Sequence, residues 1–253
     1  MSYKIIPIDV GTLMCSRGVH TYMAHMDQIM EEFRHIAWYI TGGEEDIIVD
    51  TGPGDTKIFN ERHWPTQRTP EQEPERAFQL AGVDFAKVKH VILTHLHPNK
   101  CGNNHLFPNA KFYVQRSELQ SAIAPVFACQ MEGYECLEMG LRNEFFMNTT
   151  YTVLDGDYTP CPGVEIIHTP GHTPGSQCVS VDTGKGKFII TGDVVPLREN
   201  WDGGPWYSPH IPNTIHTDLM AYQLSFKRLE GLGGTILPGC EVSIFDQPCY
   251  PAP

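Results

Sequence analysis

The stretch Thr94-His95-Leu96-His97-Pro98-Asn99-Lys100 follows a short apolar run that begins at His90 and is expected to form a strand. Side chains two positions apart on a strand point to the same side. At a strand end, the imidazoles of His95 and His97 can therefore reach one ion. Two unrelated histidines would produce the same pattern, so the pair is a weak signal by itself. Its meaning depends on the polar side chains that follow later in the chain.

Two later segments supply further donor groups, each at the end of an apolar run. Thr169-Pro170-Gly171-His172-Thr173-Pro174-Gly175 places an imidazole between tight turns, and Thr191-Gly192-Asp193 places a carboxylate after another expected strand. Three imidazoles and a carboxylate are a suitable ligand set for Zn²⁺, Fe²⁺ or Mn²⁺. The sequence thus predicts one divalent metal ion per chain, with zinc as the expected ion and iron or manganese as alternatives, held by His95, His97, His172 and Asp193.

Composition narrows the class of protein. The chain has 253 residues, which suits one large domain spanning 1–253, and its formal net charge is -12 without a basic cluster, which argues against a nucleic-acid partner. No apolar run approaches the ~20 residues that cross a bilayer, and the first residues lack a secretory signal pattern. A cytoplasmic location and a small-molecule substrate are expected. The eight cysteines form no C-x-x-C pair and are expected to be reduced.

Apolar runs and turn signals predict alternating strands and helices. Two rounds of strands followed by helices indicate two packed sheets with helices outside. A helix with its N-cap at Thr217 should end at Gly233 and bury one face, formed by Leu219, Tyr222, Phe226 and Leu229. The other helices are expected at 75–81 and 117–127, and the strands at 5–10, 37–41, 46–50, 90–94, 110–114, 151–154, 164–168, 177–181, 187–191 and 235–237.

Five motifs, in this order, resemble those of the metallo-β-lactamase superfamily, and the chain is most similar to N-acyl-homoserine-lactonase-like proteins from about residue 5 to 245. The resemblance implies an α/β fold: an αββα sandwich of two mixed β-sheets flanked by helices, with the site along one sheet edge. It also implies two metal ions: His95, His97 and His172 match ligands of the first, and Asp193 matches the carboxylate between both. The motifs are Asp50-Thr51-Gly52, Thr94–His97, Thr169–Gly175, Thr191–Asp193 and Ile236-Leu237-Pro238-Gly239.

The second metal site of the family is not retained. The family pattern is H-x-H-x-D-H, but Asn99 stands at the Asp position and Lys100 at the last His position. The family's closing Pro-Gly-His is also altered, because Cys240 follows Pro238-Gly239. All three ligands private to the second ion are changed, which predicts a mononuclear site.

Lys100 is the most informative of these changes. An ammonium ~4 Å from a divalent ion is repelled by roughly 8 kcal/mol at an effective dielectric of 20, unless a carboxylate compensates. We therefore expect Lys100 to stand in the vacated second site, paired with Asp193, where both would act catalytically; a lysine that points to solvent is the alternative. Cys240 is either a buried inert thiol or a soft metal ligand, and Asn99 and Asp50 are expected to support the site by hydrogen bonds.

The segment from Trp201 to His210 is rich in aromatic residues and glycine, and is a candidate wall of a substrate pocket through Trp206, Tyr207 and His210. Four histidines in the N-terminal half are interpreted as surface or capping residues: His20, His25, His35 and His63.

These features favour a metal-dependent hydrolase that acts on a small molecule. From the resemblance, the bond that is hydrolysed is expected to be an ester or a lactone. Because the second ion of that family is lost, an aryl ether or a thioester bond is the alternative. The alternative is a catalytically silent family member that serves as a partner subunit or a small-molecule-binding protein. Either form is compatible with a homo-oligomer or with a hetero-oligomer containing a related subunit.

Overall fold

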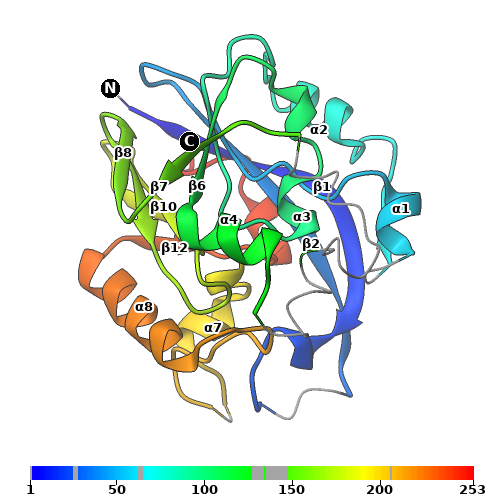
Figure 1. Ribbon diagram of the computed structural model, residues 1–253, viewed down its shortest axis with the longest axis vertical. Coiled ribbons are helices and arrows are strands. Elements are labelled where there is room, and N and C mark those ends of the chain that lie inside the picture. Colours follow the sequence, from blue (N-terminus) through cyan, green and yellow to red (C-terminus); the bar gives the residue numbers. More distant parts are fainter. Residues whose placement is uncertain (1, 25–27, 62–64, 127–133, 135–147, 206) are drawn as a thin grey trace.

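The computed structural model describes all residues except 1, 25–27, 62–64, 127–133, 135–147 and 206 (Figure 1). Its larger sheet has seven strands in the order β4-β1-β2-β3-β5-β6-β7. The pairs among β4, β1, β2 and β3 are antiparallel, and those among β3, β5, β6 and β7 are parallel. The strands are β1 (Lys4–Ser16), β2 (Met30–Thr41), β3 (Ile47–Val49), β4 (Thr66–Gln67), β5 (His90–Ile92), β6 (Lys111–Gln115) and β7 (Tyr151–Leu154).

The smaller sheet has five strands in the order β12-β11-β10-β9-β8. Its pairs are antiparallel except for β11 with β12, so both sheets are mixed, as expected. The strands are β8 (Tyr158–Cys161), β9 (Val164–His168), β10 (Gln177–Asp182), β11 (Lys187–Ile190) and β12 (Thr235–Leu237).

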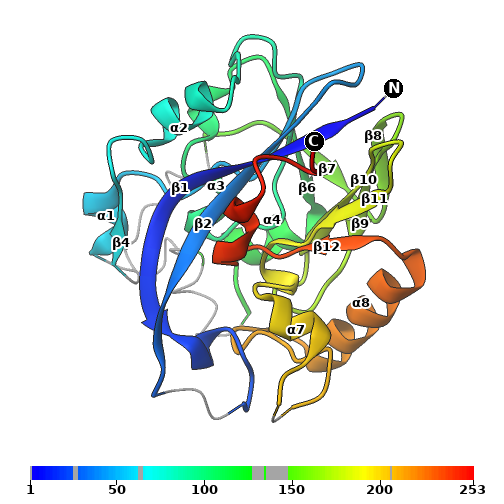
Figure 2. The ribbon, with the colours of Figure 1, turned by 180° about the vertical axis from the view of Figure 1, so that it is seen from behind.

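Helices cover the outer faces of both sheets, and α8 lies on the opposite side of the molecule from α1 and α2 (Figures 1 and 2). Among the described helices, none has the length and hydrophobicity that a membrane-spanning segment requires. The α-helices are α1 (Thr56–Asn60), α2 (Pro74–Leu80), α3 (Pro98–Cys101), α4 (Arg116–Ile123), α7 (Arg198–Asp202) and α8 (Leu219–Leu232), and the 3-10 helices are η1 (Arg17–Val19), η2 (Asn104–Leu106), η4 (Gly192–Val194) and η5 (Val242–Asp246).

Successive side chains of a strand point to opposite faces of its sheet, so the apolar side chains pack between the two sheets and on the outer face of each sheet. Between the sheets, Trp38 and Val49 meet Ile166 and Val179. On the outer face of the larger sheet, residues such as Ile48 and Val91 pack against α2 through Ala77 and Phe78. On the outer face of the smaller sheet, Cys178 and Ile189 pack against Tyr222 and Phe226 of α8. The chain therefore forms the αββα sandwich that the resemblance implied.

Several local predictions differ from the structure. Gly11 does not end the first strand: its φ of 146° accompanies a β-bulge between Asp9 and Thr12, and β1 continues to Ser16. Strands β4 and β8 were not predicted, because 66–67 is very short and 158–161 is interrupted by Pro160. The N-cap of α8 is Asp218, whose carboxylate accepts from the amides of Met220 and Ala221.

Helix α8 otherwise follows the prediction closely. Its C-cap is Gly233, and Tyr222, Phe226 and Leu229 are buried. Leu219, expected on the same face, is 37% exposed. Thr217, which was expected to cap the helix, instead directs its hydroxyl to the carbonyl of Gly171. That bond fixes the start of α8 to the loop that contains His172.

Candidate metal centre

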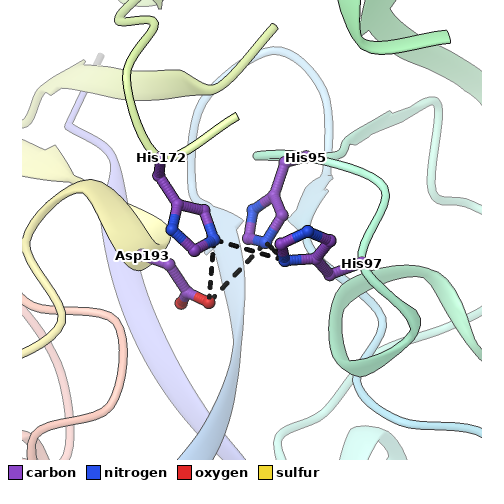
Figure 3. Close-up of side chains that lie close together, drawn as sticks. All are labelled: His95, His97, His172 and Asp193. Carbon is purple, nitrogen blue, oxygen red and sulfur yellow. Dashed lines mark hydrogen bonds and ion pairs between the residues drawn. The ribbon is translucent and has the colours of Figure 1, made fainter. Parts of the chain in front are cut away.

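The side chains of the four predicted donor residues point toward one another (Figure 3). His95 and His97 follow β5, His172 lies between β9 and β10, and Asp193 lies in η4 after β11. One nitrogen or oxygen from each lies within 4.8 Å of those of the others. Nδ1 of His97 is 3.0 Å from Nε2 of His95 and 3.2 Å from Nε2 of His172. Oδ2 of Asp193 is 3.6 Å and 3.7 Å from the same two Nε2 atoms.

Hydrogen bonds on the far side of the rings fix which nitrogen faces the centre. Thr94 gives its hydroxyl proton to Asp50 at 2.8 Å, so its oxygen accepts from Nδ1 of His95 at 3.1 Å. Nδ1 of His172 donates to the carbonyl of Ile215 at 2.7 Å. Both rings therefore present an unprotonated Nε2 to the centre.

Burial keeps these imidazoles neutral. It lowers the pKa of His172 and lowers that of His95 well below its ordinary value; for His95 the neighbouring His97 adds to the effect.

Asp50 has φ of 59° and also accepts from the amide of Thr94 at 2.7 Å. Its geometry matches the supporting position proposed for it from the sequence.

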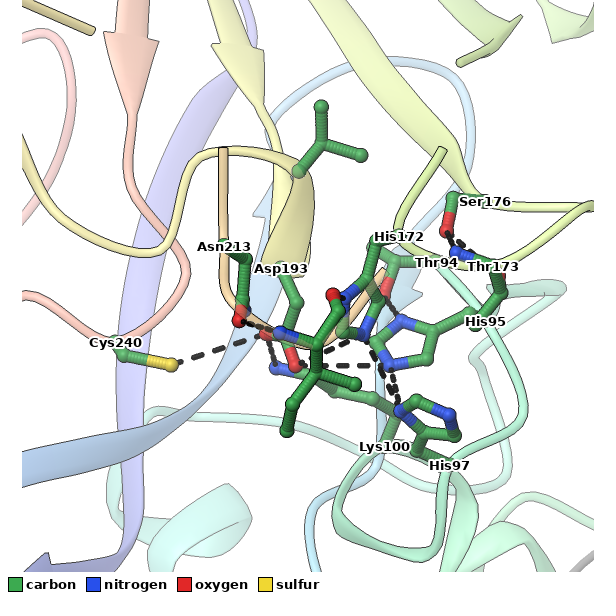
Figure 4. A network of polar contacts seen from close by, with 12 residues as sticks. Thr94, His95, His97, Lys100, His172, Thr173, Ser176, Asp193, Asn213 and Cys240 are labelled. Atoms are coloured by element: carbon green, nitrogen blue, oxygen red, sulfur yellow. Dashed lines mark hydrogen bonds and ion pairs between the residues drawn. The ribbon is translucent and has the colours of Figure 1, made fainter. Parts of the chain in front are cut away.

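The other side of Asp193 is occupied by a protein cation (Figure 4). Nζ of Lys100 lies 2.7 Å from Oδ1 of Asp193, and the lysine side chain is only 2% exposed. Sγ of Cys240 lies 3.8 Å from the same oxygen. Lys100 thus points inward to the carboxylate, and the alternative of a lysine directed to solvent is wrong.

The Lys100–Asp193 pair is stable in its charged form. Burial alone would raise the pKa of Asp193, but the Lys100 ammonium brings it well below its ordinary value. Burial alone would lower the pKa of Lys100, but the Asp193 carboxylate raises it. Burial also raises the pKa of the Cys240 thiol, which keeps it protonated.

The remaining predicted residues have contacts of other kinds. Asn99 is half-buried, and its side chain forms no hydrogen bond to a residue in the described part of the chain. Tyr207 donates its hydroxyl to Glu199, which also pairs with Arg17 at 2.5 Å. His210 stacks on Phe226, with ring centroids 5.3 Å apart. Trp206 lies outside the described residues.

Sequence reasoning missed several residues near the centre. His20 and His35 are buried, so neither is a surface residue, although His20 caps the C-terminus of η1, in agreement with the capping alternative. His25 and His63 lie outside the described residues. Glu118 of α4 is fully buried and accepts from the amide of Leu96, between the first two histidines. A glutamate in the first turn of a helix usually contacts solvent, and no signal in the sequence distinguished this one.

Comparison with known proteins identifies the family of the chain. The family model described as "Metallo-beta-lactamase superfamily" matches residues 32–239. The chain belongs to the metallo-beta-lactamase superfamily. An N-acyl homoserine lactonase of Bacillus sp is 30% identical over 169 residues, which are 63% of this chain and 63% of that protein. The N-acyl homoserine lactonase AttM of Rhizobium radiobacter is 35% identical over 127 residues, 48% of this chain and 46% of AttM. The chain therefore aligns with less than two thirds of the length of these relatives.

Solved structures support the fold across nearly the whole chain. An N-acyl homoserine lactone hydrolase with N-hexanoyl-L-homoserine bound at its catalytic metal center superposes with a TM-score of 0.78 at 21% identity, covering 97% of this chain and 96% of the other. AidC, described as a dizinc quorum-quenching lactonase, gives a TM-score of 0.67 at 15% identity, covering 99% and 89%. At these identities the likeness concerns the superfamily fold alone.

Proposed function

We propose that this chain is a hydrolase that uses one divalent metal ion to cleave an ester or lactone bond in a small organic molecule. The names of the Bacillus and Rhizobium relatives support the reaction class. One observation carries the mononuclear part of the proposal: the ion pair of 2.7 Å between Lys100 and Asp193. By its position in the family motif, that ammonium takes the place of a ligand to the second ion.

The chemistry of the donor set fits a single ion. The imidazoles of His95, His97 and His172 and Oδ2 of Asp193 place four candidate ligand atoms within 4.8 Å of one another, and zinc prefers four nitrogen, sulfur or oxygen ligands of this kind. We assign His95, His97, His172 and Asp193 to the ion, with zinc as the expected metal. When bound, the ion supplies Lewis acidity for a carbonyl oxygen or for water.

The protein groups beside the ion have distinct tasks. A carboxylate with a strongly lowered pKa is a poor proton acceptor at neutral pH, so Asp193 orients water rather than storing its proton. Lys100 supplies a fixed positive charge that needs no reorganisation during the reaction, and such a charge stabilises a developing oxyanion. The loop with Tyr207 and His210, anchored through Glu199 and Phe226, forms a wall of the substrate pocket in this proposal.

Metal analysis of protein purified without chelator tests the stoichiometry. We expect about one ion per chain, and two ions would contradict the replacement of the second ion by Lys100. No ion under metal-replete conditions would contradict the enzyme proposal and favour a silent subunit.

In parallel, a panel of γ-lactones, aryl esters and thioesters should show metal-dependent hydrolysis that is strongest for a lactone or an ester. The variant Lys100→Ala should lower kcat, and an unchanged kcat would remove Lys100 from the catalytic group.

A further inference from the structure

Glu118 is a buried carboxylate that lies outside the set of donor residues. It sits in the first turn of α4, and its side chain is completely buried. Burying an ionised carboxylate is unfavourable unless donors surround it. Oε1 accepts from the amide of Leu96 at 2.8 Å and from the hydroxyl of Tyr134 at 3.0 Å, and Oε2 accepts from the amide of Gly175 at 3.1 Å. The side chain of Thr173 also hydrogen-bonds this carboxylate.

These donors belong to the segments that carry the histidines. Leu96 lies between His95 and His97, and Gly175 ends the loop that contains His172. Each carboxylate oxygen therefore holds a different ligand-bearing segment. Tyr134 adds a third connection, since its ring centroid is 5.0 Å from that of His97.

The contact between Gly175 and α4 is tightly fitted. A Cβ on Gly175 would lie 2.3 Å from both the Cβ and the backbone nitrogen of Glu118, so only glycine permits this approach. The same loop is braced internally, because the amide of Thr173 donates to the hydroxyl of Ser176 at 3.0 Å. The loop is thus pressed against Glu118 and has little freedom to shift.

We propose that Glu118 is a positioning residue that clamps the His95–His97 segment to the His172 loop and thereby sets the affinity of the metal centre. This inference rests on the proposed function, because it assumes that the three histidines bind the ion. A carboxylate can accept from both segments at once. A glutamine has one oxygen, so it can hold one segment while turning its amide hydrogens toward the donor of the other.

Titration of chelator-treated protein with Co²⁺ tests the clamp. For Glu118→Gln we expect the Co²⁺ dissociation constant to rise about 10- to 100-fold, the range for lost outer hydrogen bonds to ligands, together with a changed visible absorption spectrum of the bound cobalt. Glu45→Gln is the matched control: it makes the same chemical change at a carboxylate that bonds His90, at the opposite end of β5. That control should bind Co²⁺ like the wild type.

The outcomes separate this inference from the metal assignment. If the wild type does not bind Co²⁺, the proposed function fails first. Wild-type affinity and spectrum in folded Glu118→Gln, or equal losses in both variants, would overturn the clamp. Should Glu118→Gln fail to fold, Glu118→Asp decides: it keeps the charge but is one methylene too short to reach both segments. Its affinity for Co²⁺ should also fall, and an unchanged affinity would overturn the inference.

Discussion

The two carboxylate oxygens of Asp193 face different kinds of neighbours. Oδ2 lies 3.6 Å and 3.7 Å from Nε2 of His95 and His172, whereas Oδ1 lies 2.7 Å from the Lys100 ammonium and 3.8 Å from the Cys240 thiol. On the histidine side, lone pairs converge, and a bound cation would relieve their repulsion. On the lysine side, the protein supplies its own cation. The same carboxylate can thus serve one metal site and one ion pair.

Removing a donor from the histidine side should have the largest effect. In His97→Ala we expect the bound metal to fall well below one ion per chain and hydrolysis to fall at least ~10³-fold, because several kcal/mol of Lewis-acid stabilisation is lost. Metal analysis and kcat/KM on the best substrate from the panel measure both quantities. Full metal content in this variant would break the comparison, because the histidine side would then not be the metal site.

Restoring the family pattern on the lysine side should convert it into a second metal site. The triple variant Asn99→Asp, Lys100→His, Cys240→His removes the cation and supplies the three missing ligands. We expect its metal content to rise from about one ion to about two, measured after dialysis against Zn²⁺. The single variant Cys240→His keeps the ammonium and should remain at one ion. One ion in the triple variant would show that more than these three side chains excludes the second metal.

Breaking the ion pair should cost stability. Lys100→Met leaves the buried Asp193 carboxylate without its cation, and removing one partner of a buried pair costs about 3–5 kcal/mol. Arg116→Met is the control, because its pair with Asp155 has side chains 55% and 64% exposed. Exposed pairs contribute at most about 1 kcal/mol. Denaturant unfolding of metal-free protein measures the difference, and adding Asp193→Asn to Lys100→Met should recover most of the loss.

Patterns in the sequence were sufficient for the fold and for the four donor residues. Alternation of apolar residues predicts strands independently of their distant partners, and most predicted strands are confirmed. The donors follow the ends of β5, β9 and β11. These strands belong to two different sheets, so the convergence of the donors was predicted from the resemblance to the superfamily, which the order of the motifs carries. The inward direction of Lys100 was also predicted, because a charge so close to Asp193 needs a partner.

Features that depend on distant packing were not predictable in the same way. Glu118 has the sequence context of an exposed helical glutamate, and it is buried by segments that are distant in the sequence, among them Leu96 and Gly175. His35 lies on β2, where its ring is enclosed by neighbours from separate segments, including Thr66, whose hydroxyl oxygen is 2.9 Å from Nε2. Gly11 reads as a strand end, because the sequence does not reveal that pairing with β2 resumes at Thr12 after the bulge.

The lysine side of Asp193 also affects buried histidines, which gives the smallest predicted effect. Burial lowers the pKa of His35 to about 3 and of His20 to about 4, and the charge of Lys100 contributes to both. An unfolded histidine has a pKa of about 6.5. Below pH 6.5 the unfolded chain therefore binds protons that the folded chain excludes. Stability is complete above that pH and declines as the pH falls toward about 4, by about 1.4 kcal/mol per pH unit for each histidine.

Substitution of one histidine should reduce this acid sensitivity by a measurable amount. In metal-free His35→Gln, we expect the free energy of unfolding to fall less steeply between pH 6 and pH 5 than in the wild type, by about 1.4 kcal/mol per pH unit. Glutamine can still bond Thr66, so the comparison at pH 8 isolates the part of the change that is independent of pH. Identical slopes would mean that His35 binds a proton in the folded state, and that Lys100 and burial do not exclude a charge there. A shallower slope would show that the Lys100 ammonium beside Asp193, together with burial, also keeps His35 neutral.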